Sequence, residues 1–224
     1  MRTVVLVPRR SGEEHRDRAW AWVQARWARE HPGWEVIEGH HDLGPFNRSA
    51  AINTAAAHTD SWDVAVIADA DSFVDAARLV EAVEAAHVTG KLTVGFELRA
   101  HVRQEMTEQI LAGFAGPWEP GVADWLAEHC SGMIAVPRRL WELVGGFDER
   151  FAAPGAEDVA FAVIASDFGG GRLRVPGVLW HLWHPIRGES THANNELLGR
   201  YLDAHRRFAA GERDAYWPLV GVSV

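Results

Sequence analysis

The chain of 224 residues is poor in cysteine and lysine, and it has no long apolar segment. Cys130 is the only cysteine, which excludes an internal disulfide and leaves no second thiol for a cysteine-based zinc site. No apolar run approaches the roughly 20 residues that a membrane-spanning helix needs. The apolar stretch at residues 3–7 is too short for the core of a signal peptide. These features predict a soluble protein, which we expect to be cytoplasmic.

Positive charge is scarce as well. The 22 lysines and arginines face 31 aspartates and glutamates, which gives a net charge of −9. Nucleic acids and anionic membranes require a basic surface on their partners, so this balance argues against both. The 11 tryptophans stand against only 2 tyrosines, and tryptophan serves both in packed cores and in platforms that stack on sugars. Trp118, in a loop rich in proline and glycine, can serve either use.

The length fits a single domain with a sizeable core, and strand-like and helix-like segments alternate along it. This alternation predicts an α/β domain. Predicted strands cover residues 3–7, 34–37, 64–68, 92–98, 133–136, 173–175 and 178–182. Predicted helices follow residue 11 and cover residues 47–58, 75–87, 104–114, 138–144, 157–168 and 194–209. The rest of residues 101–130 is mixed in pattern.

Two carboxylates, Asp69 and Asp71, follow the continuous apolar run of residues 64–68, which is typical of a strand buried on both faces. They therefore lie at the carboxyl edge of the predicted sheet, where open α/β folds bind ligands. Residues i and i+2 share a side, so both acids can face one site. Carboxylate oxygens suit Mg²⁺ or Mn²⁺, ions that bridge diphosphates. The alternative is a turn with two solvated acids.

A second acid pair, Glu157 and Asp158, begins the predicted helix at residues 157–168. Acids in a first helical turn commonly complement the helix dipole, which is the structural interpretation of this pair. The functional interpretation is a catalytic carboxylate beside a substrate, with one acid accepting a proton and the other a hydrogen bond. Gly155 in the preceding loop is compatible with closure over a ligand.

Two histidines and three arginines complete the candidate residues. His181 and His184 follow a predicted strand at a spacing that lets both reach one point, and neutral imidazole binds Mn²⁺-type ions. Their alternative is an aromatic-rich edge of the core. Arg9, Arg10 and Arg48 lie near strand or helix ends, where arginine pairs with phosphate in bidentate fashion, although surface arginines are common in this chain.

The order of these pieces resembles the GT-A glycosyltransferases, and most closely the β-1,4-galactosyltransferase-like group with its bacterial and phage relatives. Residues 7–15 (VPRRSGEEH) resemble the I-P-F-R-N-R-x-E-H turn of the first strand. Residues 46–53 resemble the F-N-R-A-x-x-L-N helix start. Asp69-Ala70-Asp71 takes the place of the D-V-D metal motif, and residues 146–158 follow the G-F…G-G-E-D stretch.

The resemblance implies a GT-A fold with a mixed, mostly parallel central sheet flanked by helices. It implies one domain over residues 1–224, with a nucleotide-binding half at about 1–100 and an acceptor and catalytic half at about 101–224. The implied reaction is transfer of a sugar, with inversion, from a UDP-sugar to a hydroxyl of a glycan, protein or small molecule.

The resemblance also implies a role for each site residue. The donor-binding residues are Pro8, Arg9, Arg10, Phe46, Arg48, Asp69, Ala70, Asp71 and Gly155. The ligands of Mn²⁺ or Mg²⁺ are Asp71, His181 and His184, the base is Asp158, and Glu157 binds a sugar. Three alternatives stay open: a retaining transferase of the same fold, a nucleotidyltransferase, and a degenerate protein that only binds a carbohydrate or nucleotide.

Overall fold

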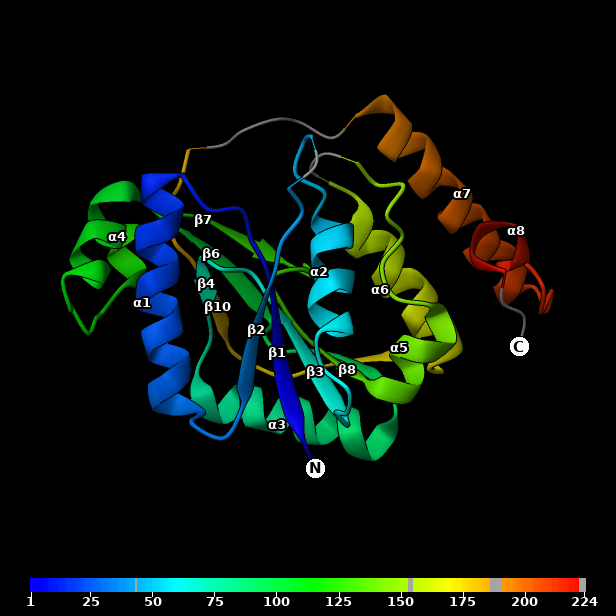
Figure 1. Ribbon diagram of the computed structural model, residues 1–224, viewed down its shortest axis with the longest axis horizontal. Helices are drawn as coiled ribbons and strands as arrows, with labels where there is room; N and C mark the ends of the chain where they lie inside the picture. Colours follow the sequence, from blue (N-terminus) through cyan, green and yellow to red (C-terminus); the bar gives the residue numbers. More distant parts are fainter. Residues whose placement is uncertain (43, 153–154, 186–190, 222–224) are drawn as a thin grey trace.

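The computed structural model describes residues 1–42, 44–152, 155–185 and 191–221, and it contains two sheets with helices around them (Figure 1). The larger sheet has six strands in the order β2-β1-β3-β8-β5-β9. Its strands are β1 (Thr3–Pro8), β2 (Glu35–Gly39), β3 (Val64–Ala68), β5 (Leu92–Val94), β8 (Met133–Pro137) and β9 (Arg172–Arg174). The smaller sheet has the order β4-β10-β6-β7, with β4 (Ser72–Phe73), β6 (Leu98–Val102), β7 (Val122–Ala127) and β10 (Val178–His181).

The larger sheet is mixed. β1 runs parallel to β2 and β3, and β9 runs parallel to β5. β8 runs antiparallel to both β3 and β5. The central strands β1, β3 and β8 are buried along their whole length, as expected for strands covered on both faces. The prediction of an α/β fold with a mixed central sheet is therefore confirmed.

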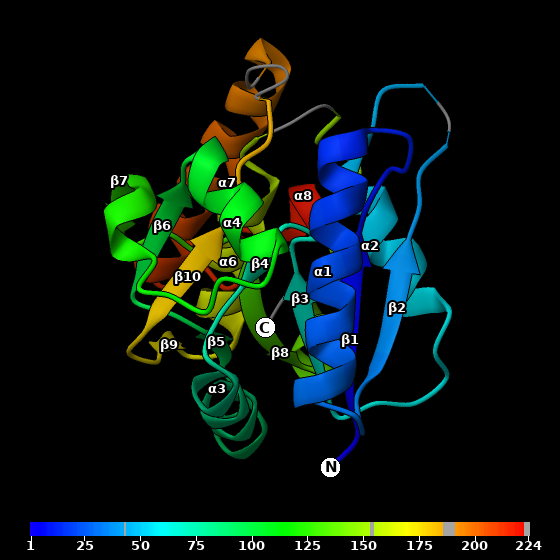
Figure 2. The same ribbon diagram turned by 90° about the vertical axis from the view of Figure 1, so that its left-hand side faces the viewer.

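The helices lie around both sheets. They are α1 (Glu14–Glu30), α2 (Arg48–Ala57), α3 (Ala76–Thr89), α4 (Gln104–Leu111), α5 (Arg138–Val144), α6 (Glu157–Phe168), α7 (His192–Ala209) and α8 (Trp217–Val220), with a 3₁₀ turn at Glu119–Gly121. α1 and α2 lie on opposite sides of β1 and β2 (Figures 1 and 2). α1 buries Trp20, Val23 and Trp27, the face that their spacing predicts. None of the helices within the described ranges is both long and apolar enough to cross a bilayer.

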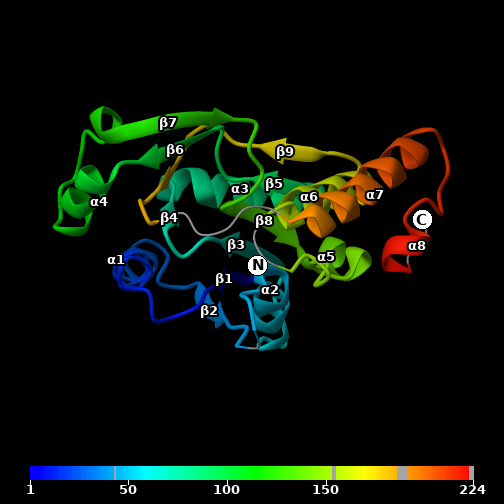
Figure 3. The same ribbon diagram turned by 90° about the horizontal axis from the view of Figure 1, so that it is seen from above.

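The region between residues 92 and 130 differs from the prediction. The single strand expected at residues 92–98 is two strands, because β5 belongs to the larger sheet and β6 to the smaller one. β7 was not predicted at all. Its first residue, Val122, is buried and the next five are exposed, so it has no alternation of apolar and polar residues to read. Seen from above, β6 and β7 lie on one side of the molecule and β1 and β2 on the other (Figure 3).

Candidate active site

A pocket of about 450 Å³ opens where β1 and β3 end, beside the first turns of α1 and α2. The carboxyl ends of parallel strands are the usual ligand-binding edge of such sheets. The lining residues are Pro8, Arg9, Arg10, Glu13, Arg16, Pro45, Phe46, Arg48, Asp69, Ala70, Asp71, Gly155, Glu157, His181 and His184. All nine residues predicted to bind the donor are in this set, together with the three predicted metal ligands. The fold therefore brings together segments that lie as much as 176 residues apart, from Pro8 to His184.

Three of these side chains form a candidate metal site. Nε2 of His181 lies 3.5 Å from Oδ1 of Asp71, and Nε2 of His184 lies 3.3 Å from its Oδ2. One ligand atom from each residue lies within 4.8 Å of the others. Backbone pairing holds the group in place, since Ser72 of β4 pairs with His181 of β10 and the Leu182 amide donates to the Asp71 carbonyl at 2.8 Å.

The donor set fits a divalent transition ion. One carboxylate and two imidazoles suit Mn²⁺ better than Mg²⁺, which prefers oxygen ligands alone. Imidazole binds a metal only in its neutral form. Burial lowers the pKa of His181 to about 3, with the charges of Arg99 and His184 acting in the same direction and Asp71 opposing it. His181 is therefore uncharged at neutral pH, and the ring loses no net proton when it binds the ion.

Arg48 joins the two predicted acid pairs. Its Nη2 donates to Oδ1 of Asp69 at 2.7 Å, and its Nη1 lies 3.5 Å from Oε1 of Glu157. Burial disfavours ionisation of Asp69, but the positive charges of Arg48 and Arg99 outweigh it and hold the pKa of that carboxyl well below its usual range. Burial likewise opposes the charge on Arg48, and the neighbouring carboxylates overcome it and raise its pKa. Arg48 and Asp69 are thus a fixed ion pair at neutral pH.

The surroundings of Glu157 raise its pKa, whereas those of Asp69 lower the pKa of that carboxyl. Burial raises the pKa of Glu157, the charge of Asp158 adds to this, and Arg48 only partly offsets it. Within the described ranges no group of the protein hydrogen-bonds its buried Oε2. A buried polar atom without a partner is costly, and in a pocket wall it is a candidate contact for a ligand hydroxyl.

The first-strand arginines line the pocket but have different partners. Arg9 forms ion pairs with Asp17 and with Glu38, the latter at 2.7 Å, so its charge is already balanced. Arg10 is exposed and donates to the Gly44 carbonyl at 3.0 Å. Of the two, Arg10 has the guanidinium that remains available to an anion.

Asp158 is placed apart from the other predicted residues. Of the two acids that begin α6, the pocket lining includes Glu157 and not Asp158. The Asp158 Oδ1 accepts a hydrogen bond from the Val159 amide at 2.8 Å. Its charge acts on Arg48 and on His129, which lies beyond the end of β7. Asp158 therefore lies beside the pocket rather than in it.

Besides Pro45, two lining residues were not predicted, Glu13 and Arg16. They lie three residues apart at the start of α1, and Nε of Arg16 is 3.3 Å from Oε2 of Glu13. Their helical spacing was the one available signal, and nothing in that spacing indicates contact with residues 71 or 184.

Of the two roles open to Trp118, the structure supports packing. Its ring contacts Phe73 and Trp180 edge to face, and it is not part of the pocket lining.

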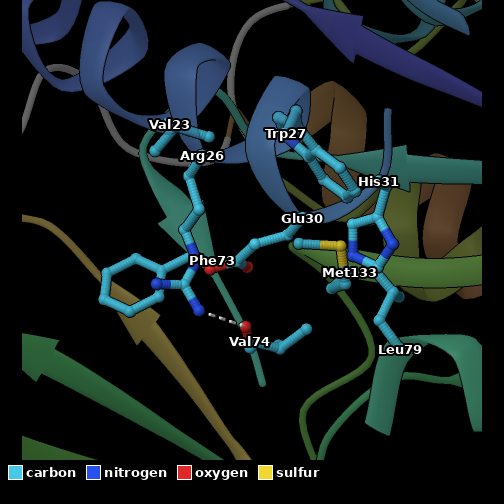
Figure 4. Close-up of a pocket in the computed structure, with 9 residues that line it drawn as sticks. All are labelled: Val23, Arg26, Trp27, Glu30, His31, Phe73, Val74, Leu79 and Met133. Atoms are coloured by element: carbon cyan, nitrogen blue, oxygen red, sulfur yellow. Dashed lines mark hydrogen bonds and ion pairs between the residues drawn. The ribbon is translucent and has the colours of Figure 1, made fainter. Parts of the chain in front are cut away.

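A second cavity lies between α1 and β4, with a volume of about 20 Å³ (Figure 4). It has room for about one water molecule and none for a sugar nucleotide. The Arg26 guanidinium points across it to the Val74 carbonyl at 3.2 Å and lies 4.8 Å from the Phe73 ring centroid. We interpret this cavity as a packing gap beside a structural arginine.

Comparison with solved structures identifies the fold. No protein-family model and no curated protein matches the sequence. A mutant of Drosophila β1,4-galactosyltransferase 7, in complex with manganese, UDP-Gal and xylobiose, is similar with a TM-score of 0.55 and 12% identity over 88% of this chain and 79% of that one. The chain has a GT-A fold.

Two further structures with this GT-A fold are larger proteins. GalNAc-T7 with UDP, GalNAc and Mn²⁺ gives a TM-score of 0.53 and 14% identity over 93% of this chain. TarS of S. aureus gives 0.54 and 10% identity over 98% of this chain. In both, the matched part is 44% of the neighbour, so this chain spans less than half of their length.

Proposed function

We propose that this protein is a metal-dependent glycosyltransferase, which moves a sugar from a UDP-sugar to an acceptor hydroxyl with inversion. The observation that carries the proposal is one pocket that combines the Asp71, His181 and His184 triad with the guanidinium of Arg10, beside the ion pair of Arg48 and Asp69. A divalent cation and arginine are the two means by which proteins commonly bind a diphosphate. GT-A structures that hold manganese with UDP-Gal, or Mn²⁺ with UDP, support the same donor chemistry here.

We assign donor binding to about residues 1–100 and the acceptor and catalytic half to about residues 101–224. The pocket lining supports this division. Its members from Pro8 to Asp71 come from the first half, and those from Gly155 to His184 come from the second. The proposed reaction centre lies where the two halves meet.

Each catalytic side chain has a defined task in the proposed reaction. The Mn²⁺ ion, when bound, supplies positive charge that stabilises the departing diphosphate. The acceptor oxygen bonds to the anomeric carbon, the bond from that carbon to the diphosphate oxygen breaks, and Asp158 accepts the hydroxyl proton on Oδ2. Oδ1 of Asp158 is held by the Val159 amide, which orients the carboxylate.

The remaining residues position the reactants. Glu157 contacts a sugar hydroxyl through its buried Oε2. Arg48 keeps Asp69 and Glu157 in place between the nucleotide and the sugar. Because Asp158 lies beside the donor pocket, we place the acceptor on that side, where a glycan, a protein or a small molecule can present its hydroxyl.

The first test is a binding screen of the wild-type protein with UDP-, GDP- and CMP-sugars, each with Mn²⁺ and with EDTA. We expect a rise in melting temperature with a UDP-sugar that disappears in EDTA, because the ion and the nucleotide stabilise the folded state together. A preference for another nucleotide would contradict the UDP assignment. Failure to bind any nucleotide sugar with Mn²⁺ would favour a degenerate transferase.

The second test is the anomeric configuration of the product, read by NMR once a donor is known. Inversion is the expected result for direct displacement with Asp158 as base. A product that retains the donor configuration would establish the retaining alternative. Release of pyrophosphate from a nucleoside triphosphate would identify a nucleotidyltransferase instead.

A further inference from the structure

Arg16 places a positive charge directly against the candidate metal site. It belongs to the first turn of α1, and its Nη1 lies 3.6 Å from Oδ2 of Asp71. Its Nη2 lies 3.1 Å from Nδ1 of His184. Two of the three members of the triad therefore contact the same guanidinium, although α1 is distant from both in sequence.

The two hydrogen-bond partners of His184 Nδ1 require different proton positions. Arginine only donates, so a bond from Arg16 makes Nδ1 the acceptor and places the imidazole proton on Nε2. A carbonyl oxygen only accepts, so the Pro185 carbonyl, 3.0 Å away, requires the proton on Nδ1. Only the second arrangement leaves a lone pair on the Nε2 that faces Asp71, and metal-bound histidines commonly donate their other N–H in this way.

Arg16 is also held more loosely than the structural arginine of the pocket. Its contacts with Asp71, His184 and Glu13 measure 3.6, 3.1 and 3.3 Å. Arg48 contacts Asp69 at 2.7 Å, the length of a charge-assisted hydrogen bond. The side chain of Arg16 is 39% exposed and lines the pocket, so it can reorient there without disturbing the core.

We propose that Arg16 and a divalent cation compete for Asp71 and His184, and that Arg16, once displaced, binds the diphosphate of the donor. This inference rests on the proposed function, because it takes a nucleoside diphosphate as the anion. Like charges exclude each other from one carboxylate, while the anionic ligand offers the displaced guanidinium a new partner in the same pocket. Arg16 thereby couples metal binding to donor binding.

The test is the variant Arg16→Gln, which removes the charge and keeps a polar but shorter side chain. Mn²⁺ alone, measured by EPR of the free ion, should bind the variant about fivefold more tightly or better, a typical coupling between two sites. UDP, measured by calorimetry at saturating Mn²⁺, should bind about tenfold more weakly because a charge-assisted hydrogen bond is lost. The two affinities are expected to change in opposite directions.

Two further variants control the experiment. Arg18→Gln removes a charge from the same helix, where Arg18 pairs with Glu108 at 2.6 Å outside the pocket lining, and it should change neither affinity. Arg16→Lys keeps the charge and should restore Mn²⁺ affinity to near the wild-type value.

The outcomes separate this inference from the proposed function. If the wild type binds Mn²⁺ and UDP but Arg16→Gln weakens Mn²⁺ binding or leaves it unchanged, Arg16 does not compete with the ion and the inference is wrong. In that case the proposed function stands. If the wild type binds neither Mn²⁺ nor UDP, both the function and the inference are overturned.

Discussion

Arg48 donates from Nη2 to Oδ1 of Asp69 at 2.7 Å, which joins the first residue of α2 to the residue that follows β3. Both side chains are largely buried, and their charges persist because each stabilises the other against burial. The pair connects the start of one donor-binding segment with the acidic turn that carries the candidate metal ligand.

Removing the arginine from this pair should destabilise the protein strongly. Arg48→Met leaves Asp69 and Glu157 without their common partner, and breaking a buried ion pair costs about 3 kcal/mol of unfolding free energy. Urea denaturation at neutral pH measures this. Arg18→Met breaks the exposed pair with Glu108 and should cost much less, because solvent screens the attraction between exposed charges. Equal losses in the two variants would show that the Arg48 pair is no stronger than a surface contact.

Removing the shared carboxylate should abolish metal binding. Asp71→Ala leaves two imidazoles and no anionic ligand, so Mn²⁺ affinity should fall by more than about 100-fold, beyond the usual effect of changing an outer contact. Calorimetry with Mn²⁺ alone tests this. Asp124→Asn, which changes an exposed carboxylate paired with His101, is the matched control and should bind Mn²⁺ as the wild type does. Normal Mn²⁺ binding by Asp71→Ala would remove the triad from consideration.

Exchanging the proposed base should separate binding from transfer. Asp158→Asn keeps the shape of the side chain and loses the proton acceptor, so transfer should fall at least about 100-fold. UDP affinity with Mn²⁺ should stay near the wild-type value, because Asp158 is not part of the pocket lining. Turnover and calorimetry on the same preparation give both quantities. Transfer at the wild-type rate by this variant would eliminate Asp158 as the base.

The buried imidazole of His181 should make stability depend on pH. Its pKa of about 3 in the folded protein is below the ordinary histidine value of 6.5, so as pH falls the unfolded chain takes up a proton that the folded protein does not. The unfolding free energy contributed by this group is full above pH 6.5 and is lost toward pH 3. Between pH 7 and pH 5 the loss is about 2 kcal/mol.

The variant His181→Gln removes that titration and should lose about 2 kcal/mol less than the wild type between pH 7 and pH 5. Urea denaturation at the two pH values, without added metal, measures the difference. His192→Gln changes a histidine that is 88% exposed and should behave as the wild type does. A slope in His181→Gln equal to that of the wild type would mean that His181 is accessible to protons in the folded state.

Strong local patterns made most of the fold predictable. The apolar runs at β1, β3 and β8 and the helix periodicity of α1 each depend on neighbouring residues, and the structure has them close to the expected positions. β7 was not predicted because its residues after Val122 are exposed and do not alternate between apolar and polar. The division of residues 92–98 between β5 and β6 was not predicted either. Whether a strand belongs to one sheet or the other depends on its pairing partner, which local sequence does not specify.

The sequence by itself determined which chemistry is available: two carboxylates after a buried strand, an acid pair at a helix start, two spaced histidines and a few placed arginines. These are properties of residue type and local order. Only the tertiary structure decided their partners, since charge and burial act through space. It set Arg48 between Asp69 and Glu157, left Asp158 beside the pocket lining, and brought Arg16 against Asp71 and His184.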